Sequence, residues 1–446
     1  MAANQNENGF KLRLFSLVLV IFCLLNSGGL SWVFAENGEW KTDLSLQLIG
    51  GVGGKTSNDT PLNYANKVMQ IPSYQAVLEL RPELKSERGM FSLRARPRFI
   101  REFSKSRINS NWEPFESLGK FQWSEAYVEA SIGPDVLFSY GLQNLQWGQT
   151  ETLSPSNRIF RDSIQVKDTL YDVRGRHSFK LNYSPSKDWS VIGFAEIAET
   201  GEMGSTEFEA EEAFGKKAVL KAEKNFSGGA HTLGFVAGLR ERHGGWFGSY
   251  GSAEVLDGLT LFGDLGAEVG SANWYPVFDK QTGLTTLSQI YRNSGRVSTS
   301  SVLGARYSFT GGTDFRVEWI FQELGYTASQ IETIYDAASS RSPIQQAKNI
   351  ELLPRLIKSG LELPGRQYLM ASLRIPDVFE FQKTLVYSRI LFSPRDYSAT
   401  AYLTVEIPVS SYGTSFVELY QSFGENQSEL KGFVGSSFLA GYRQYF

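Results

Sequence analysis

The chain has 446 residues, of which 20% are charged, 41% hydrophobic and 13% aromatic, and it contains 43 Gly but only 15 Pro. The 44 Lys and Arg residues nearly balance the 47 Asp and Glu residues, which argues against nucleic acid as a partner. A high aromatic and glycine content with a modest hydrophobic fraction is typical of a barrel that is apolar on one face only.

The first 35 residues have the pattern of an export signal. Lys11 and Arg13 precede an apolar run that ends at Leu25, and the small residues up to Ala35 suit a cleavage site. The run is about 12 residues long, whereas a helix that spans a membrane needs ~20. We therefore predict a cleaved signal peptide over residues 1–35.

The remaining residues, 36–446, are predicted to form one domain. Beyond Ala35 no stretch approaches the ~18 consecutive apolar residues of a membrane helix, so any membrane passage must use strands. The only cysteine, Cys23, lies inside the predicted signal peptide, which removes disulfides and zinc-thiolate sites from the mature chain. We expect neither a metal nor another cofactor.

Alternation of apolar and polar residues predicts 18 strands. Their predicted starts lie near Trp40, Ser73, Phe91, Phe121, Asp135, Arg176, Asp188, Phe214, Gly229, Phe247, Gly258, Thr299, Asp314, Arg366, Phe379, Tyr397, Gly413 and Gly432. A soluble β-sandwich would show the same alternation, so the strands alone do not define the fold.

The connections between the predicted strands discriminate between the two folds. Links such as Gly133-Pro134 and Asp257-Gly258 are short, whereas 50–72, 102–120, 148–175 and 325–365 are long. Short turns at one end and long loops at the other are typical of a transmembrane antiparallel β-barrel, whose short turns are periplasmic. We therefore predict an all-β barrel of about 18 strands, with 16 as the alternative.

Two of the long connections carry patterns of their own. The loop from Gly50 begins with a glycine-rich piece that lacks the spacing of a phosphate-binding loop. In residues 325–365, Ser329 and Glu332 have the spacing of a capping box, and Pro343 opens a second helical stretch. This helical hairpin is predicted either to cover the pore mouth or to pack on its rim.

The segment 124–161 carries the most specific motif. It contains Glu125-Ala126-Tyr127-Val128, and the positions that follow are Gly141, Gln143, Trp147-Gly148, Pro155 and Asn157. This order resembles a family of porin-like outer-membrane proteins, many of undefined substrate, although Leu142 stands where that family usually has arginine. The resemblance implies a loop after Trp147 that folds inward and narrows the pore. Trp147 as a member of an aromatic girdle at the membrane surface is the alternative.

The last strand ends on an aromatic residue, with Tyr442 and Phe446 on one face. Such an ending resembles the recognition signal of bacterial outer-membrane barrels. It implies assembly by the barrel-assembly machinery into the outer membrane, in contact with lipid and lipopolysaccharide.

Charged residues on the third and fourth predicted strands are expected in the lumen. Arg94, Arg96 and Arg98 alternate with apolar residues, and the next strand carries Glu125 and Glu129. Neighbouring antiparallel strands would bring these opposite charges together. Paired charges would stiffen the wall, whereas an unpaired arginine would attract anions.

Catalysis has little support in the sequence. His177, His231 and His243 fall on separate strands or rims, and a catalytic pair must lie within hydrogen-bond reach. We therefore predict a channel for small polar or anionic solutes, with the oligomeric state open. The alternatives are a polysaccharide-export barrel, an adhesin or assembly partner, and a lipid-acting enzyme.

Overall fold

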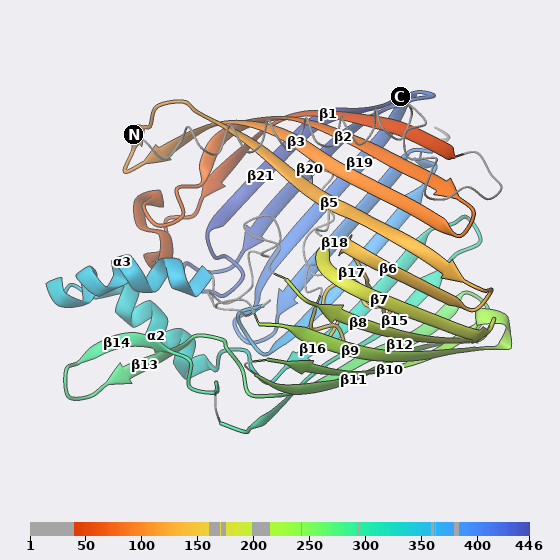
Figure 1. Cartoon of the computed structure of the whole chain (residues 1–446). Coiled ribbons are helices and arrows are strands. Elements are labelled where there is room, and N and C mark those ends of the chain that lie inside the picture. The colour runs from red at the N-terminus through yellow and green to blue at the C-terminus, as the bar shows by residue number, and fades with distance from the viewer. Residues whose placement is uncertain are drawn as a thin grey trace, which may run out of the picture.

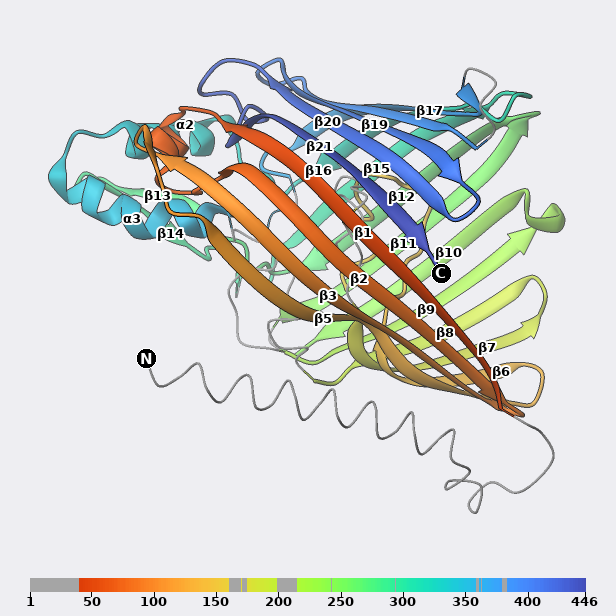
Figure 2. The same cartoon turned by 90° about the horizontal axis from the view of Figure 1, so that it is seen from above.

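The computed structural model describes residues 40–159, 170, 175–198, 215–241, 243–292, 294–357, 361, 363–378 and 383–446. Eighteen antiparallel strands form a closed barrel (Figures 1 and 2), in which β1 (Lys41–Ser57) pairs with both β2 (Pro72–Arg88) and the last strand, β21 (Val434–Tyr445). The predicted fold is therefore confirmed. The predicted signal peptide lies outside the described residues.

The strands between β2 and β21 follow one another around the wall. They are β3 (Phe91–Ile108), β5 (Glu116–Ile132), β6 (Val136–Gln143), β7 (Arg176–Ser186), β8 (Trp189–Glu196), β9 (Lys217–Phe226), β10 (His231–Arg240), β11 (His243–Leu256), β12 (Leu259–Val269), β15 (Val297–Ser308), β16 (Asp314–Gln322), β17 (Gln367–Pro376), β18 (Leu385–Ser393), β19 (Ser398–Ser410) and β20 (Gly413–Phe423).

Seven further elements lie in the connections, as far as these are described. They are the two-residue strand β4 (Asn111–Trp112), which pairs with β3, the hairpin of β13 (Tyr275–Asp279) and β14 (Leu284–Ser288), the helices α2 (Ala328–Ser339) and α3 (Pro343–Ile357), and the short turns η1 (Pro61–Asn66) and η4 (Ser227–Gly229). Neither helix is long and apolar enough to cross a membrane, as far as the described residues extend.

The wall separates an apolar outer face from a largely polar inner face. On β16, Phe315, Val317 and Trp319 are exposed on the outside, whereas Glu318 between them is fully buried on the inside. Successive side chains of a strand point to opposite faces, so the alternation in the sequence becomes this separation of faces. An unpartnered backbone would be costly in hydrocarbon, and closure through β1 and β21 removes the open edge.

Several predicted strands have different bounds in the structure. The piece 50–57 was expected in a loop but continues β1, where Gly54 pairs with Tyr74 of β2. The predicted loop 102–120 is shorter, because β3 and β5 pair as far as Ser104 and Glu116. Phe379 lies outside the described residues, and β18 begins only at Leu385. In the first two cases the backbone pairing continues beyond the residues that alternate between apolar and polar. That alternation is the only signal for a strand that the sequence offers, so the strand ends were missed.

The long connections gather at one end of the barrel (Figure 1), where α2, α3 and the β13–β14 hairpin form a layer. The predicted helical hairpin is present, but its first cap differs from the prediction. Thr327 is the N-cap and forms the capping box with Gln330, not Ser329 with Glu332. The β13–β14 hairpin was not predicted, because its alternation covers only five residues on each side.

Candidate functional site: a segment that crosses the lumen

The segment begins where β6 ends. Gly141 has a φ of 134°, and a Cβ at this position would lie 2.3 Å from the carbonyl oxygen of Ala126, so glycine is required here. Gln143 is buried: its Oε1 accepts from Ser139 Oγ at 2.5 Å, and its Nε2 donates to the carbonyl of Ser178 at 3.0 Å. These contacts fix the point from which the chain leaves the wall.

Trp147 and Gly148 direct the chain into the lumen. Trp147 is 8% exposed and packs inside the barrel against Phe194 and Trp246, while its Nε1 donates to Ser156 Oγ at 3.0 Å. It is therefore a lumen residue, and its assignment to an aromatic girdle is wrong. Gly148 has a φ of 87°, and a Cβ there would lie 2.9 Å from a carboxylate oxygen of Asp264.

Asp264 of β12 is the first anchor of the segment on the far wall. Its carboxylate accepts from Ser154 Oγ at 2.8 Å and from the backbone N–H and Oγ of Ser156 at 2.7 and 3.1 Å. On the same strand, a Cβ at Gly266 would lie 2.2 Å from the carbonyl oxygen of Pro155. Glycine at this position therefore lets the segment lie directly on the wall.

Glu318 of β16 is the second anchor. It is fully buried and accepts from the backbone N–H groups of Glu151 and Thr152 at 2.7 and 3.1 Å, and also from the Thr152 hydroxyl. Arg316 of the same strand donates to the carbonyl of Gln149 at 2.7 Å. Both anchors accept from backbone N–H groups and therefore hold the backbone of the segment, not only its side chains. Hydrogen bonds to a charged group are also roughly twice as strong as neutral ones.

The rest of the described segment is held by Asn157 and Arg158. Asn157 donates from Nδ2 to the carbonyl of Leu145 at 3.3 Å and accepts from the N–H of Ile159 at 3.3 Å, which closes the loop on itself. Arg158 lies 3.3 Å from Glu268 of β12. The inward bend is therefore stabilised both by its own contacts and by the wall.

The chain returns to the near wall at Leu170. The carbonyl of Leu170 accepts from Arg81 Nη2 of β2 and from Arg98 Nη2 of β3, each at 2.8 Å. The strands β2 and β3 lie across the barrel from β12 and β16 (Figure 1). The connection between β6 and β7 therefore touches both walls, and we call its longest described stretch, residues 144–159, the crossing segment.

The predicted charge pairing on the near wall is present for Glu125. Its Oε2 lies 3.4 Å from Arg94 Nε and 3.3 Å from Arg96 Nη1. Glu83 of β2 is a further partner, 2.9 Å from Arg94 and 3.9 Å from Arg96. These side chains connect three neighbouring strands, β2, β3 and β5, in one row of alternating charge.

Two other near-wall pairings differ from the prediction. Arg98 pairs with Glu79 of β2, which also lies 2.6 Å from Arg81 and is 1% exposed. Glu129 lies 3.5 Å from Lys180 of β7 and not beside an arginine. The prediction sought partners for the arginines of β3 only on the following strand, β5. Each strand of a barrel has two neighbours, and β2 supplies the further partners Glu79 and Glu83.

Two inward arginines on the far wall differ from those of the near wall in their ion pairing. Arg306 of β15 and Arg389 of β18 make no ion pair with any carboxylate of the described residues, and the Nε of Arg306 is buried without a hydrogen-bond partner. Arg306 also lies opposite Arg316 in the β15–β16 register. Sequence alternation places both residues inward but does not reveal that they lack partners.

A cavity of about 420 Å³ lies beside Arg306. It is lined by the crossing segment and five strands: Glu151, Arg306, Asp314, Arg316, Ser372, Arg374, Leu385, Tyr387, Thr404 and Glu406. Small-molecule sites commonly have volumes of about 300–1,000 Å³. The cavity is therefore large enough for a small solute, and its wall offers both guanidinium and hydroxyl groups.

The loops at the long-loop end pack onto the crossing segment. Leu153 shares a buried cluster with Leu363 and with Ile320, Tyr368 and Met370 of the wall. The loop after β16 thus reaches into the mouth, which favours the predicted covering position over packing on the rim alone.

Glu429 joins three of these loops. Its carboxylate accepts from the N–H of Gly365 at 2.5 Å and lies 3.4 Å from Arg395 Nε. Burial raises the pKa of Glu429 from its usual 4.5 to about 7, although the amide of Gly365 lowers it. The mouth is therefore closed in part through a group that titrates near neutral pH.

The remaining predicted residues lie away from the lumen. His177 is on the outer face, 5.1 Å from the ring of Tyr140, whereas the adjacent Ser178 is buried on the inner face. Phe446 and Tyr442 are exposed on the outer face of the β21 end, and the backbone of Phe446 pairs with Leu46 of β1. His177 and Ser178 therefore point to opposite faces of β7.

Comparison with solved structures shows which proteins share this fold. The chain is similar to OccAB1 of Acinetobacter baumannii (TM-score 0.55, 10% identity, 91% of this chain and 96% of that chain). It is also similar to a BenF-like porin from Pseudomonas fluorescens Pf-5 (TM-score 0.53, 10% identity, 92% and 99%). A third similar structure is Pseudomonas aeruginosa OccK2 in complex with glucuronate (TM-score 0.50, 9% identity, 91% and 98%). The chain has the fold of these proteins.

At the level of sequence there is no corresponding match. No protein-family model matches the chain, and none of the curated proteins is significantly similar to it. Because the identities to the solved structures are 9 to 10%, the likeness shows the fold, and the function must be argued from the residues of this chain.

Proposed function

We propose that this chain is an outer-membrane channel through which small polar solutes diffuse, with a preference for anions. The observation that carries the proposal is the crossing segment inside a closed barrel whose outer face is apolar and whose inner face is polar. A barrel of this kind suits a bilayer on the outside. The segment narrows the aqueous path to a size at which wall residues can contact a passing solute.

The preference for anions is inferred from the far wall. Arg306 and Arg389 have no carboxylate partner among the described residues, and unpaired cations in a narrow pore attract anions. The arginines of the near wall contribute less, since Glu79, Glu83 and Glu125 neutralise them. The structural neighbour OccK2 was solved with glucuronate, a small carboxylate, which supports the same class of solute here.

Reversal potentials across a salt gradient test the proposal in planar bilayers. The wild-type channel should prefer chloride over potassium, and the Arg306→Gln/Arg389→Gln variant should lose most of that preference. The matched control is Arg94→Gln/Arg96→Gln/Glu83→Gln/Glu125→Gln, which removes two arginines together with the two carboxylates that pair with them; it leaves the net charge unchanged and should change selectivity little. Cation selectivity of the wild type, or a larger effect of the control, would contradict the anion preference. A folded barrel with no conductance would contradict the channel.

Export and assembly are proposed from the two ends of the chain. Residues 1–35 would be removed after translocation, and the aromatic end of β21, with Tyr442 and Phe446, would be recognised by the barrel-assembly machinery. The exposed position of both side chains beside β1 supports the second point. Deletion of Phe446 should lower the yield of folded protein in the outer membrane, and unchanged assembly of this variant would contradict the proposed signal.

A further inference from the structure

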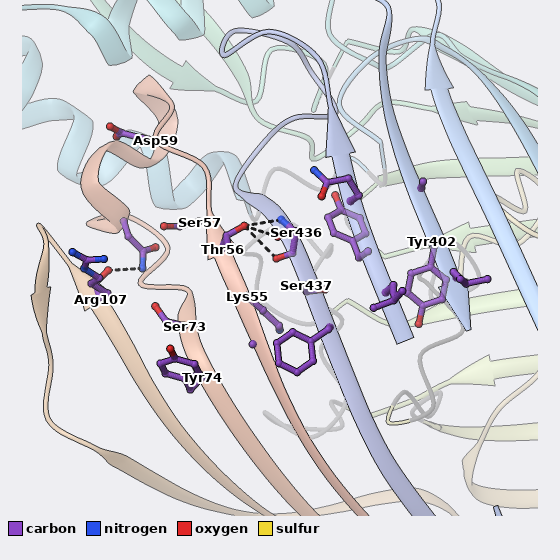
Figure 3. Close-up of a pocket in the computed structure, with 18 of the residues that line it drawn as sticks. Lys55, Thr56, Ser57, Asp59, Ser73, Tyr74, Arg107, Tyr402, Ser436 and Ser437 are labelled. Atoms are coloured by element: carbon purple, nitrogen blue, oxygen red, sulfur yellow. Dashed lines mark hydrogen bonds between the residues drawn. The ribbon is translucent and has the colours of Figure 1, made fainter. Parts of the chain in front are cut away.

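A groove of about 1170 Å³ lies at the long-loop end of the barrel, over β18–β21, β1 and β2 and the tip of β3 and β4 (Figure 3). Its side walls are outer-face residues: Ile390, Leu419 and Phe438 line it and are 52%, 45% and 49% exposed. The groove therefore opens to the surroundings of the barrel on this side, and the inward residues Arg389 and Tyr402 are also among its lining residues.

Small residues form the bottom of the groove. Gly54 and Thr56 of β1 lie beside Ser436 of β21, and Figure 3 shows Thr56 and Ser436 joined by hydrogen bonds between the two strands. A Cβ at Gly54 would lie 2.9 Å from the ring of Phe438. The glycine-rich piece of the sequence thus contributes to a strip that is bounded by large apolar side chains but is itself shallow.

Aromatic and cationic residues gather at one side of this strip. Tyr74 stacks on Trp112 with ring centroids 5.5 Å apart, and Lys105 Nζ and the Arg107 guanidinium lie 5.4 and 5.9 Å from the Trp112 ring. Lys105 is opposite Tyr74, and Arg107 is opposite Trp112, in the strand registers. All four side chains therefore share the outer face, and we call them the rim patch.

The charge of the rim patch is not neutralised by the protein. Neither Lys105 nor Arg107 has an ion pair with an Asp or Glu of the described chain, and Arg107 Nε donates only to the carbonyl of Ser110 at 3.3 Å. Asp59, the carboxylate in the groove lining, accepts from the backbone N–H of Ala65 at 3.0 Å. Cations on the near wall of the lumen, in contrast, are paired.

We propose that the groove binds one phosphorylated, acylated glycolipid of the outer leaflet. A phosphate would contact Lys105 and Arg107, a sugar ring would lie against Trp112, and an acyl chain would follow the strip beside Leu419 and Phe438. Each basic residue near an anionic membrane surface contributes about 1 kcal/mol, and Trp and Tyr favour the interface between headgroups and hydrocarbon. A second copy of the chain would bring like charges together at the rim patch, which disfavours a barrel dimer at this face.

This inference rests on the outer-membrane location in the proposed function but not on channel activity. It predicts a specific site, not the general contact that any barrel makes with lipid. The structure contains a suitable control for that difference. Lys224 lies 5.0 Å from the ring of Trp189 on the outer face at the short-turn end, so it has the same pairing of cation and indole without the groove.

The test is binding of bisphosphorylated lipid A to the purified full-length mature barrel in detergent, measured by native mass spectrometry and microscale thermophoresis. Lys105→Gln/Arg107→Gln should weaken binding by about tenfold or more, from two lost contacts of about 1 kcal/mol each. Lys224→Gln should bind as the wild type does. Ala401→Trp, which fills the strip and keeps the rim patch, should also weaken binding. Heat-modifiable migration in gels confirms folding of each variant.

Equal binding by the wild type and the double variant would overturn the proposal. A loss of binding in Lys224→Gln as large as that in the double variant would overturn it too. If dephosphorylated lipid A bound as tightly, the proposed phosphate contact would be wrong. If phosphatidylglycerol bound as tightly, the groove would be a site for anionic lipids in general, which would contradict the proposed preference for a glycolipid. Conductance of the double variant separates the two proposals. If lipid binding fails while conductance persists, only the groove assignment is wrong; if conductance is absent in all variants, the channel is wrong.

Discussion

The two walls of the lumen use the same residue types differently. On the near wall, β2, β3 and β5 pair their arginines with glutamates of neighbouring strands, as Glu125 does with Arg94 and Arg96. On the far wall, Asp264 and Glu318 accept from the backbone of the crossing segment, and Arg306 has no carboxylate partner in the described part of the chain. Charge on the near wall thus stabilises the wall itself, whereas charge on the far wall holds the constriction and faces the solute.

This difference determines which substitutions affect stability and which affect transport. A buried ion pair adds little net stability, but removing one partner leaves an uncompensated charge. Near-wall substitutions should therefore affect unfolding, and far-wall substitutions should affect conductance.

The largest effect on stability is expected at Glu79. Glu79→Ala leaves Arg81 and Arg98 buried without their shared carboxylate, which should cost about 3–5 kcal/mol of unfolding free energy. Urea unfolding of the barrel in detergent measures this. A loss of unfolding free energy no larger than the error of the fit would show that the near-wall row of charges does not stabilise the barrel.

Releasing the crossing segment should change transport more than stability. Asp264→Ala/Glu318→Ala removes the acceptors of Ser154, Ser156, Glu151 and Thr152. Single-channel recordings should show higher and noisier conductance, and limited proteolysis should cut within 144–159. A quiet channel of wild-type conductance would mean that the segment is held by other contacts.

The pH dependence of the mouth is a smaller effect that Glu429 should control. Its pKa is raised from 4.5 to about 7, so the folded mouth holds a proton that the open loops release. The stabilising contribution is complete below about pH 4.5 and is lost as the pH rises through 7. The protection factors of residues 424–433 in hydrogen exchange, which are corrected for the intrinsic pH dependence of exchange, should fall over this range, and Glu429→Gln should make these protection factors independent of pH. An unchanged profile in the variant would assign the effect to another group.

The smallest effect is expected at an exposed pair. Asp314 lies 3.7 Å from Arg374, and the two side chains are 29% and 50% exposed. Asp314→Asn should change the unfolding free energy by less than about 1 kcal/mol, as exposed pairs do. A loss as large as that of Glu79→Ala would remove the distinction between buried and exposed charges on which this comparison rests.

The barrel could be predicted from the sequence, because its two signals are local. Alternation identifies membrane strands, and turn residues such as Asp257-Gly258 separate them. Polar strand ends carry neither signal, so 50–57 was assigned to a loop although its backbone pairs with β2.

The candidate site could be predicted only in part. The motif around Trp147 indicated an inward loop, but its anchors Asp264 and Glu318 lie more than a hundred residues away. Contacts across a lumen follow neither strand register nor helical spacing, so no periodic pattern marks them. The available signal was weak: Asp264 lies two residues before Gly266, a small residue at which the crossing segment approaches the wall.

The most direct test of the account is the single-channel conductance of a barrel in which residues 149–159 are replaced by a short Gly-Ser link. The part of the crossing segment that Asp264 and Glu318 hold is then absent, while β6, β7 and the wall charges remain. Conductance should rise several-fold, with heat-modifiable migration and a β-type spectrum unchanged. A correctly folded variant with the conductance of the wild type would show that the crossing segment is not the constriction of this channel.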